Sequence, residues 1–407
     1  MVSLGQQRRL NRRDLLKFGS IGAAALALPR RSLYAAVAQA AAPAIKHIVK
    51  VEYGKPIRLP GSHGDTWTTT WADDDELYTA ADDTFGFENS SDGNLAVHRL
   101  SGTPPDLRGA TVNTMAEFGK ECEKKGDGAV WKASGFTCVD GVLYLSVSRH
   151  YTKSMMGKKG ENPDYFWIQE TCDASIIKST DHGKTWSPTP KLGHAMFPGR
   201  TFSVPYFVQY GKDGNVAGED VHASWEARDR FDYVYALSND GAWDNGNWMT
   251  MGRVSRGLIG RLDPEDWEFI HDWTDKREPI WGPRHDNAVY MFRAPGRTSM
   301  TGVHYIAPLG LYIMPQWYYD HLEDTTERRI SRTVWELYSA PAPWGPWTLF
   351  NRQVWDPQGF YNPGIPAKFI SPDGRSFWII AAGDFTDQSP GGLYGLHMIP
   401  VTLDLAL

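Results

Sequence analysis

Short runs of apolar and β-favouring residues follow one another through the chain, and turn-forming residues separate them. In the clearest case, residues 65–71 are rich in Thr and Trp, and the acidic run Asp73-Asp74-Asp75 follows. A second run, 77–80, leads to Asp82 and Asp83. The pattern predicts two strands joined by an acidic turn, with Asp65 at the start of the first strand.

Strand-rich blocks of this kind recur at intervals of roughly 60 to 90 residues. The first block ends with a strand at 94–100, and Asp140-Gly141 joins two runs of the second block in a strong hairpin signal. Strands are expected at 133–139, 142–148, 174–178 and 185–187, at 204–210, 233–237 and 248–254, at 301–306, 311–314, 334–339 and 347–350, and at 367–370, 377–382 and 393–401.

A block of four antiparallel strands is one blade of a β-propeller, an architecture that leaves few exposed edges. Five blocks of similar order therefore predict an all-β chain folded as a five-bladed β-propeller, with one β-sandwich or a pair of them as the alternative. Residues 179–186 fit the Asp-box pattern Ser-x-Asp-x-Gly-x-Thr-Trp, and residues 340–347 occupy the equivalent turn of the fourth block. Both are interpreted as structural turns.

The first forty residues have the features of an export signal. Asn11-Arg12-Arg13-Asp14-Leu15-Leu16 is a twin-arginine motif, residues 18–28 form an Ala-rich apolar core, and Ala38-Gln39-Ala40 is a small-residue cleavage site. A membrane anchor is the alternative, but the core is shorter than the roughly 20 residues that a membrane span needs. We predict a signal peptide over 1–40, a single propeller domain over 41–407, and a periplasmic or secreted protein exported by the twin-arginine translocase.

The amino-acid composition limits the class of binding partner. The 17 Trp, 18 Tyr and 17 Phe supply rings for the core and flat faces for sugars, and 40 Gly and 26 Pro suit a protein with many turns. The net charge of -6 argues against nucleic acid or an acidic polymer as the main partner. Cys122, Cys138 and Cys172 have no metal-binding spacing, so one disulfide, for instance Cys122–Cys172, is the most they form.

In a propeller the first strand of each blade lines a central funnel, and loops at one end build the site. A glycosidase needs one carboxylic acid and one carboxylate, about 5–5.5 Å apart for retention or about 6.5–9.5 Å for inversion. Positions at strand ends make Asp65, Asp83 and Glu226 the candidate catalytic residues, with Asp286 as the alternative to Glu226. The candidate substrate-binding residues are Trp67, Asp82, Arg149, His150, Arg228, Asp286, Gln316 and Trp317.

Some of these residues also have a purely structural explanation. Arg228 and Asp229 are suited to an ion pair between blades, and His150 and His285 to hydrogen-bonded structural positions. No Gly-x-Ser-x-Gly, phosphate-loop or His-Glu-x-x-His motif occurs, so no cofactor is expected. The many Asp residues leave room for Ca²⁺, although an Asp-x-Asp-x-Asp-Gly loop is absent from the sequence.

Several segments together resemble a secreted bacterial family. They are Gly64-Asp65-Thr66-Trp67, Trp71-Ala72-Asp73-Asp74, Leu77-Tyr78-Thr79-Ala80, Glu226-Ala227-Arg228-Asp229, Tyr233-Val234-Tyr235, Ala340-Pro341 and Trp344-Gly345-Pro346-Trp347. The family was long known only as a domain of unknown function. Some members are endo-D-arabinanases, and the fold resembles the five-bladed glycoside hydrolases of the family 43 type.

The resemblance runs from about Gly61 to Leu396. It implies an Asp at the start of blade one, which Asp65 matches by position, then a second Asp and a Glu acid. Asp83 (or Asp82) and Glu226 are the looser matches for these two.

We therefore predict an exported glycoside hydrolase that cleaves an arabinan-type or other polysaccharide with paired carboxylates in the funnel. The alternative is a non-catalytic carbohydrate-binding or scaffold propeller. Two funnel carboxylates within about 10 Å of each other favour the enzyme. One acid surrounded by many aromatic residues favours the binding protein.

Overall fold

The computed structural model describes residues 47–89, 94–116, 118, 129–154, 167–188, 190, 193–216, 231–321, 330–356, 359–389 and 391–406. The predicted signal peptide, its cleavage site and Cys122 lie outside these residues. So do Glu226 and Arg228.

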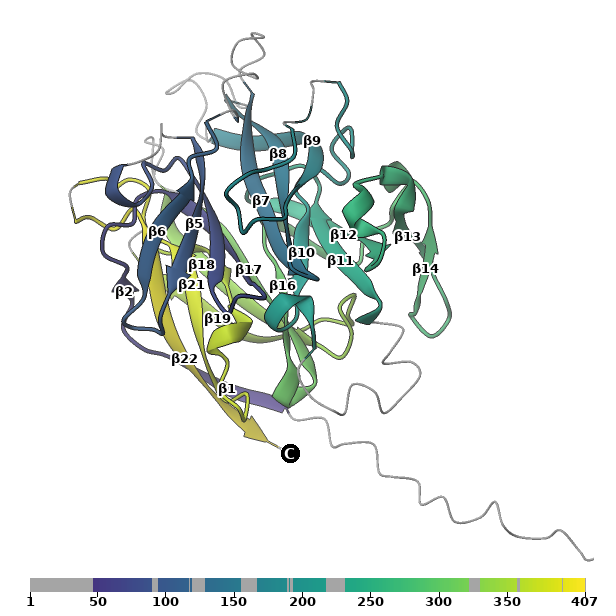
Figure 1. Ribbon diagram of the computed structural model, residues 1–407. Helices are drawn as coiled ribbons and strands as arrows, with labels where there is room; N and C mark the ends of the chain where they lie inside the picture. Colours follow the sequence, from purple (N-terminus) through teal and green to yellow (C-terminus); the bar gives the residue numbers. More distant parts are fainter. Residues whose placement is uncertain are drawn as a thin grey trace, which may run out of the picture. The chain divides into compact units, whose positions relative to one another are not determined.

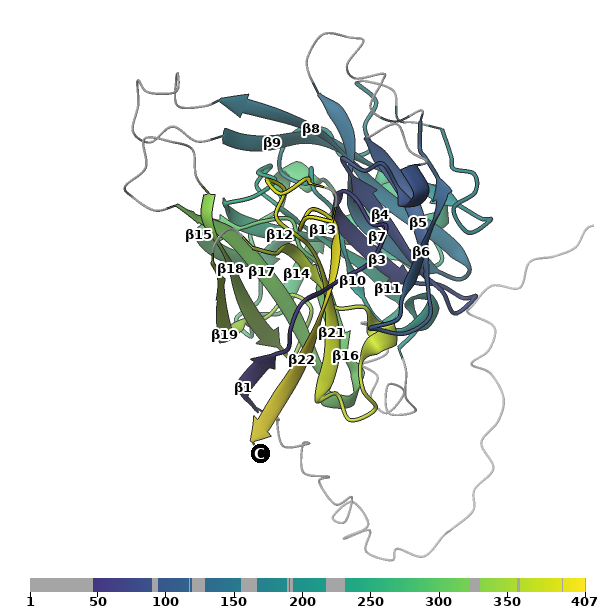
Figure 2. The ribbon, with the colours of Figure 1, turned by 90° about the vertical axis from the view of Figure 1, so that its left-hand side faces the viewer.

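The first sheet is an antiparallel meander in chain order. It contains β3 (Asp65–Trp71), β4 (Leu77–Asp82), β5 (Leu95–Ser101) and β6 (Arg108–Asn113). The acidic run forms the turn between β3 and β4, as predicted, and this turn places Asp65 directly opposite Asp82 in the ladder. The two ends of the hairpin that carry acids therefore meet at the same end of the sheet, whose strands β3 and β4 are labelled in Figure 2.

The second sheet has three strands, β7 (Val130–Val139), β8 (Val142–Ser154) and β9 (Trp167–Ser179). The strand expected at 185–187 is wrong, because the Asp-box residues fold back into a closed turn. Asp181 accepts hydrogen bonds from the backbone N–H of Thr185 at 2.9 Å and from its hydroxyl at 2.6 Å, and Trp186 donates to the carbonyl of Gly183 at 3.0 Å.

The largest sheet contains two meanders joined by one parallel strand pair. The first holds β10 (Tyr206–Gln209), β11 (Tyr233–Asn239), β12 (Gly246–Ser255), β13 (Trp267–Trp273), β14 (Pro279–Gly282) and β15 (Phe292–Thr298). The second holds β16 (Val303–Ile306), β17 (Leu311–His321), β18 (Ile330–Ala340) and β19 (Thr348–Trp355). The innermost strands β10 and β16 lie parallel, with Val208 opposite Val303.

The fourth sheet brings the two ends of the described chain together. It contains β20 (Tyr361–Gly364), β21 (Ser376–Ala382), β22 (Leu396–Ala406), β1 (His47–Tyr53) and the short β2 (Ile57–Arg58). β1 pairs antiparallel with β22, and the two run side by side in both ribbon views (Figures 1 and 2). The strand β1 and its pairing with β22 were not predicted from the sequence.

The strand expected at 367–370 is also wrong. Ala367–Phe369 is a 3₁₀-helix, and the first strand of this sheet is β20. Pro366 precedes the helix and accepts the N–H of Phe369 at 3.0 Å. Because proline has no N–H and a fixed φ, it does not continue a ladder.

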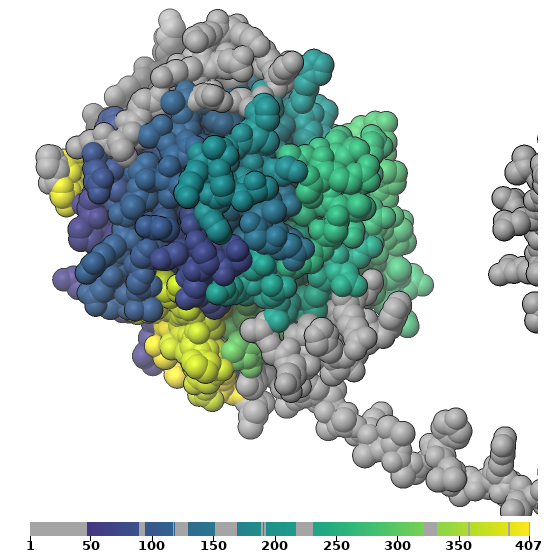
Figure 3. All heavy atoms as spheres, viewed as in Figure 1, coloured from purple at the N-terminus to yellow at the C-terminus, as the bar shows by residue number. Residues whose placement is uncertain are grey.

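Dividing the largest sheet at its parallel pair gives five antiparallel meanders, each suited to be one blade. The prediction of an all-β propeller is confirmed, whereas the number of five blades stays a prediction. In Figure 3, the outer strands of the third meander cover the right-hand side of the face shown. The other helices described are short 3₁₀ turns, at Phe87–Asn89, Lys212–Gly214, Ile259–Arg261, Pro264–Asp266, His285–Asn287 and Ala307–Leu309. Among the described residues, no helix has the length and apolar character of a membrane span.

Candidate functional site

A cavity of about 330 Å³ lies where strand ends from all five meanders converge. Its walls combine acids, a lysine, two histidines and many aromatic rings. The lining residues are His63, Asp65, Asp82, Asp83, Phe85, Lys132, His150, Gln169, Trp243, Asp244, Trp317, Tyr319, Tyr361, Phe385, Gln388 and Tyr394. Asp65, Asp82, Asp83, His150 and Trp317 were predicted for the site from the sequence.

A β-bulge at the start of β3 turns Asp65 toward the cavity. The ladder shifts between Asp65 and Thr68, and the intervening Thr66 and Trp67 have φ values of 65° and 47°. Left-handed φ in a residue other than glycine costs about 1–3 kcal/mol and persists only where neighbours hold it. Asn362 of β20 donates to the carbonyl of Thr66, and this contact fixes the bulge.

Asp65 is half-buried and held from another meander. The hydroxyl of Tyr361 donates to its Oδ2 at 2.8 Å. Burial and the nearby charge of Asp83 raise the pKa of Asp65 to about 7, although Lys132, Tyr361 and Tyr394 act in the opposite direction. Near neutral pH a carboxyl group of this kind exchanges its proton readily, as a general acid or base must.

Asp82 and Asp83 are adjacent in sequence but lie in different surroundings. Asp82 is 1% exposed and accepts hydrogen bonds from the hydroxyl of Thr66 at 3.1 Å and the N–H of Ala133 at 3.0 Å. Burial raises the pKa of Asp82 well above its usual value. The side chain of Asp83 is 61% exposed and forms an ion pair with Lys132.

Lys132 projects from β7 and is the buried cation beside these three acids, with its side chain 6% exposed. Burial lowers the pKa of Lys132, but Asp83 and Asp82 raise it by more, so the ammonium stays charged. An ion pair with this ammonium requires Asp83 to be a carboxylate. The site therefore holds one carboxyl group that is readily protonated and one that is ionised.

His150 contributes a neutral ring to the wall. Burial, followed by the charge of Lys132, lowers its pKa to about 4. Its Nε2 lies 3.0 Å from the side-chain oxygen of Gln169, and its ring meets that of Trp243 edge-on at 4.8 Å. His150 is thus both hydrogen-bonded, as a structural histidine would be, and part of the cavity lining.

Trp317, Tyr319, Tyr361 and Phe385 form a continuous aromatic wall. Trp317 and Tyr319 meet with ring centroids 5.2 Å apart, and Tyr361 lies 5.6 Å from Trp317 and 6.2 Å from Phe385. Aromatic faces of this kind stack well on the apolar face of a sugar ring. Trp317 was predicted as a binding residue, and Tyr361 was expected at the funnel because it precedes the fifth block, whereas Tyr319 and Phe385 were not predicted.

The structure places four predicted binding residues away from the cavity. Trp67 is 2% exposed and donates to the carbonyl of Gly64 at 2.9 Å, because the bulge turns it into the core. Successive side chains of a strand point to opposite faces. Because Trp317 faces the cavity, its neighbour Gln316 points away from it and is fully buried. Arg149 pairs with Asp173 at 2.9 Å, and Asp286 pairs with Arg284 at an exposed turn.

Lys132 had a signal that the sequence analysis missed. It interrupts the apolar run Val130-Trp131-Lys132-Ala133, and a lysine inside a buried strand is seldom found without a charged partner. Tyr394 had no comparable signal, and the hydrogen bond of Tyr361 with Asp65 spans 296 residues of sequence.

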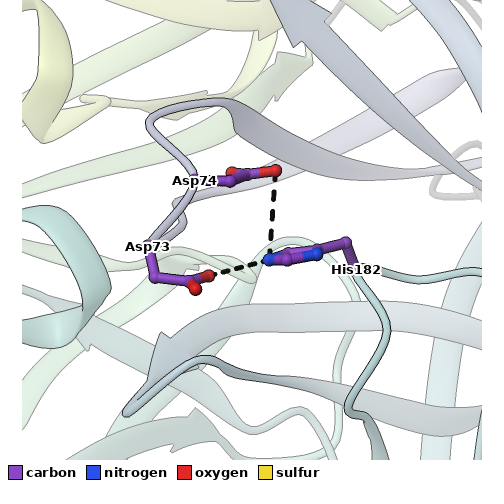
Figure 4. A group of neighbouring side chains, drawn as sticks. All are labelled: Asp73, Asp74 and His182. Atoms are coloured by element: carbon purple, nitrogen blue, oxygen red, sulfur yellow. Dashed lines mark hydrogen bonds and ion pairs between the residues drawn. The ribbon is translucent and has the colours of Figure 1, made fainter.

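A second group of acids lies outside the cavity, in the turns. His182 of the Asp-box turn lies 2.9 Å from Asp73 and 3.9 Å from Asp74 of the β3–β4 turn (Figure 4). One imidazole nitrogen and two carboxylates suit Ca²⁺ poorly, because this ion takes six to eight oxygen ligands. We interpret the group as an ion pair between the first and second meanders.

No family model and no curated protein matches this chain. Solved structures with a similar fold include a proposed hydrolase from Bacteroides ovatus, at 13% identity over 84% of this chain and 86% of that chain, with a TM-score of 0.45. The GH43 protein BlXynB from Bacillus licheniformis has 11% identity over 86% and 54%, with a TM-score of 0.41. A GH32 β-fructofuranosidase from Bombyx mori has 12% identity over 86% and 61%, with a TM-score of 0.39.

At this level of likeness, these proteins say nothing about the reaction or the sugar. The propeller rests on the strand pairing described above, and the resemblance to the endo-D-arabinanase family stays a prediction.

Proposed function

We propose that this protein is a glycoside hydrolase that uses Asp65 and Asp83 as its two catalytic carboxyl groups. The observation that carries the proposal is their pairing in one cavity under opposite influences. Burial and a neighbouring charge raise the pKa of Asp65 to about 7, whereas Asp83 forms an ion pair with Lys132. Asp65 then serves as the general acid, and Asp83 as the base or nucleophile.

The division of roles follows from what glycoside hydrolysis requires. One carboxyl group must be protonated to donate to the leaving oxygen, and the other must be ionised to activate water or attack the sugar. A buried acid with a raised pKa beside an exposed acid that is paired with a cation supports such an assignment. Asp82 is buried in the wall of the same cavity, and its contact with Thr66 makes it a positioning residue for the bulge that carries Asp65.

The lining supports a neutral sugar as substrate. Four Asp side chains line the cavity, and its one lysine is already paired with Asp83. An anionic sugar would therefore find no unpaired lysine or arginine among the described lining residues. The aromatic wall offers faces for stacking. Arabinan-type polysaccharides, which the family resemblance implies, are neutral and belong first in a substrate screen.

The test is a screen of the purified protein against neutral plant, fungal and bacterial polysaccharides, with release of reducing ends as the measurement. On the substrate that is cleaved, Asp65→Asn and Asp83→Asn are each expected to lower turnover by about 10²–10⁴-fold, the usual contribution of a catalytic acid or base. Asp75→Asn is the matched control, because Asp75 lies in the turn of the same hairpin, and Asn tolerates its φ of 72°.

Full turnover by either cavity variant would remove that residue from the catalytic pair. Binding of a polysaccharide by the unmodified protein, without release of reducing ends from any substrate, would contradict the enzyme and support a carbohydrate-binding propeller.

We also propose export through the twin-arginine translocase, on the strength of the motif at residues 11–16. Replacing Arg12 and Arg13 together by Lys is expected to retain the protein in the cytoplasm. Cell fractionation measures the change, and unaltered export of the variant would contradict the proposal.

A further inference from the structure

A second cavity, of about 360 Å³, lies between the outer strands of the third meander and the β18–β19 turn. We call it the side cavity. Trp273, Arg277, Tyr290, Met291, Phe292, Arg293, Trp344, Gly345 and Pro346 line it. It shares no lining residue with the cavity around Asp65 and Asp83, which we call the funnel cavity. Its volume lies within the range of about 300–1,000 Å³ that is typical of small-molecule sites.

The inner wall of the side cavity is rigid. Trp344 packs against Tyr235 with ring centroids 6.1 Å apart and meets Trp281 edge-on at 6.2 Å. Phe292 packs edge-on against Tyr338 at 4.9 Å. Because these rings are held by their neighbours, a ligand that stacks on them loses little freedom to the protein.

The opening of the side cavity carries its polar groups. Tyr290 is 52% exposed, and the guanidinium of Arg293 lies 6.0 Å from the centre of its ring. Arg277 sits in the tight β13–β14 turn with a φ of 61°, and its N–H donates to the carbonyl of Thr274 at 2.9 Å. Within the described part of the chain, neither guanidinium has a hydrogen-bond or ion-pair partner.

The charge of this lining is opposite to that of the funnel. Among the described residues, two arginines and no acid line the side cavity, and Asp275 and Glu278 of the same turn are not part of its lining. A guanidinium binds a carboxylate through two parallel hydrogen bonds, and it also stacks on aromatic faces. Arginines beside exposed and half-buried rings therefore suit a ligand that combines a flat apolar face with a carboxylate.

We infer that the side cavity binds a carboxylate-bearing sugar residue, that is, a uronate unit of a polysaccharide. The ring stacks on the aromatic wall, and the carboxylate lies between Arg277 and Arg293. This site is separate from the proposed reaction. A polysaccharide with mainly neutral sugar units would be held here by its acidic units while a neutral stretch of the polymer reaches the funnel cavity.

The experiment measures binding of digalacturonic acid to the intact protein by calorimetry at low ionic strength, with neutral galactobiose as the comparison. Digalacturonic acid is expected to bind, and galactobiose to bind far more weakly. Arg277→Gln and Arg293→Gln should each lower the affinity for digalacturonic acid by roughly tenfold, the effect of losing one charged hydrogen bond. Arg108→Gln, at an exposed arginine of β6, is the matched control and should have no effect.

Asp65→Asn separates this inference from the proposed function. The variant should bind digalacturonic acid as the unmodified protein does, whether or not the protein hydrolyses any polysaccharide. Three results would each overturn the inference: no binding of digalacturonic acid, equal affinity for galactobiose, or unchanged affinity when both arginines are replaced.

Discussion

The funnel cavity and the side cavity have similar volumes, about 330 and 360 Å³, but they keep their charges in different places. In the funnel, Asp82 and Lys132 are almost completely buried, and Asp65 is half-buried. In the side cavity, Arg277 and Arg293 are exposed above a wall of rings. The difference shows how burial changes the pKa and the role of a charged group. A buried group acquires a shifted pKa and suits proton transfer, whereas an exposed one attracts a ligand at little cost to the fold.

The largest expected effect is on how stability depends on pH. The pKa of Asp65 is raised from 3.8 to about 7, so between these values the folded protein binds a proton that the unfolded chain has lost. Stability from Asp65 is therefore fully present below pH 3.8 and is lost as pH rises through about 7, by about 4 kcal/mol at 1.36 kcal/mol per unit. Asp65→Asn removes this loss, so the free energy of unfolding of the variant should fall less steeply with rising pH than that of the unmodified protein.

Urea unfolding of both proteins at pH 5 and pH 8 measures the difference, and Arg277→Gln is the comparison from the side cavity. Asp82 also has a raised pKa, so some fall in stability should persist in Asp65→Asn. Identical pH dependence of Asp65→Asn and the unmodified protein would show that Asp65 is not held in the surroundings described.

A smaller effect is expected from removing the buried cation. Lys132→Met should lower stability by about 1–2 kcal/mol at neutral pH, less than the 3–5 kcal/mol typical of breaking a fully buried pair, because Asp83 is exposed and regains water. Since Lys132 lowers the pKa of Asp65, the same variant should move the titration of Asp65 above pH 7. Carbon-13 NMR of the Asp carboxyl groups measures this shift without any substrate.

Lys132→Arg keeps the positive charge and serves as the control. A titration of Asp65 that stays unchanged in Lys132→Met would mean that the lysine acts only on Asp83. In that case the two acids would not share the electrostatic coupling on which their proposed roles depend.

The smallest effect is expected in the side cavity. Arg277→Gln and Arg293→Gln should change the free energy of unfolding by less than about 0.5 kcal/mol, as is usual for exposed positions without partners. Chemical denaturation at one pH is sufficient to measure it. A loss of several kcal/mol would show that these arginines support the fold, and the contrast between the two cavities would then disappear.

Local patterns in the sequence were sufficient to predict the β3–β4 hairpin and the acids at its ends. A turn of three Asp residues between two strand-forming runs sets the register, and the register brings Asp65 and Asp82 together. The same reasoning led to Asp83, which directly follows β4. It failed at residues 367–370, where Pro366 precedes a 3₁₀-helix, and it did not find the pairing of β1 with β22.

The rest of the site was decided by tertiary structure. The bulge at Thr66 and Trp67 turned one predicted binding residue into the core, and it is held by Asn362 from the far end of the chain. Lys132 and Tyr361 reach Asp65 and Asp83 from other sheets. The acids at strand ends could thus be predicted from local patterns, because hairpin pairing and turns depend on neighbouring residues. The raised pKa of Asp65 could not, because a pKa depends on burial and on charges that distant segments bring within reach.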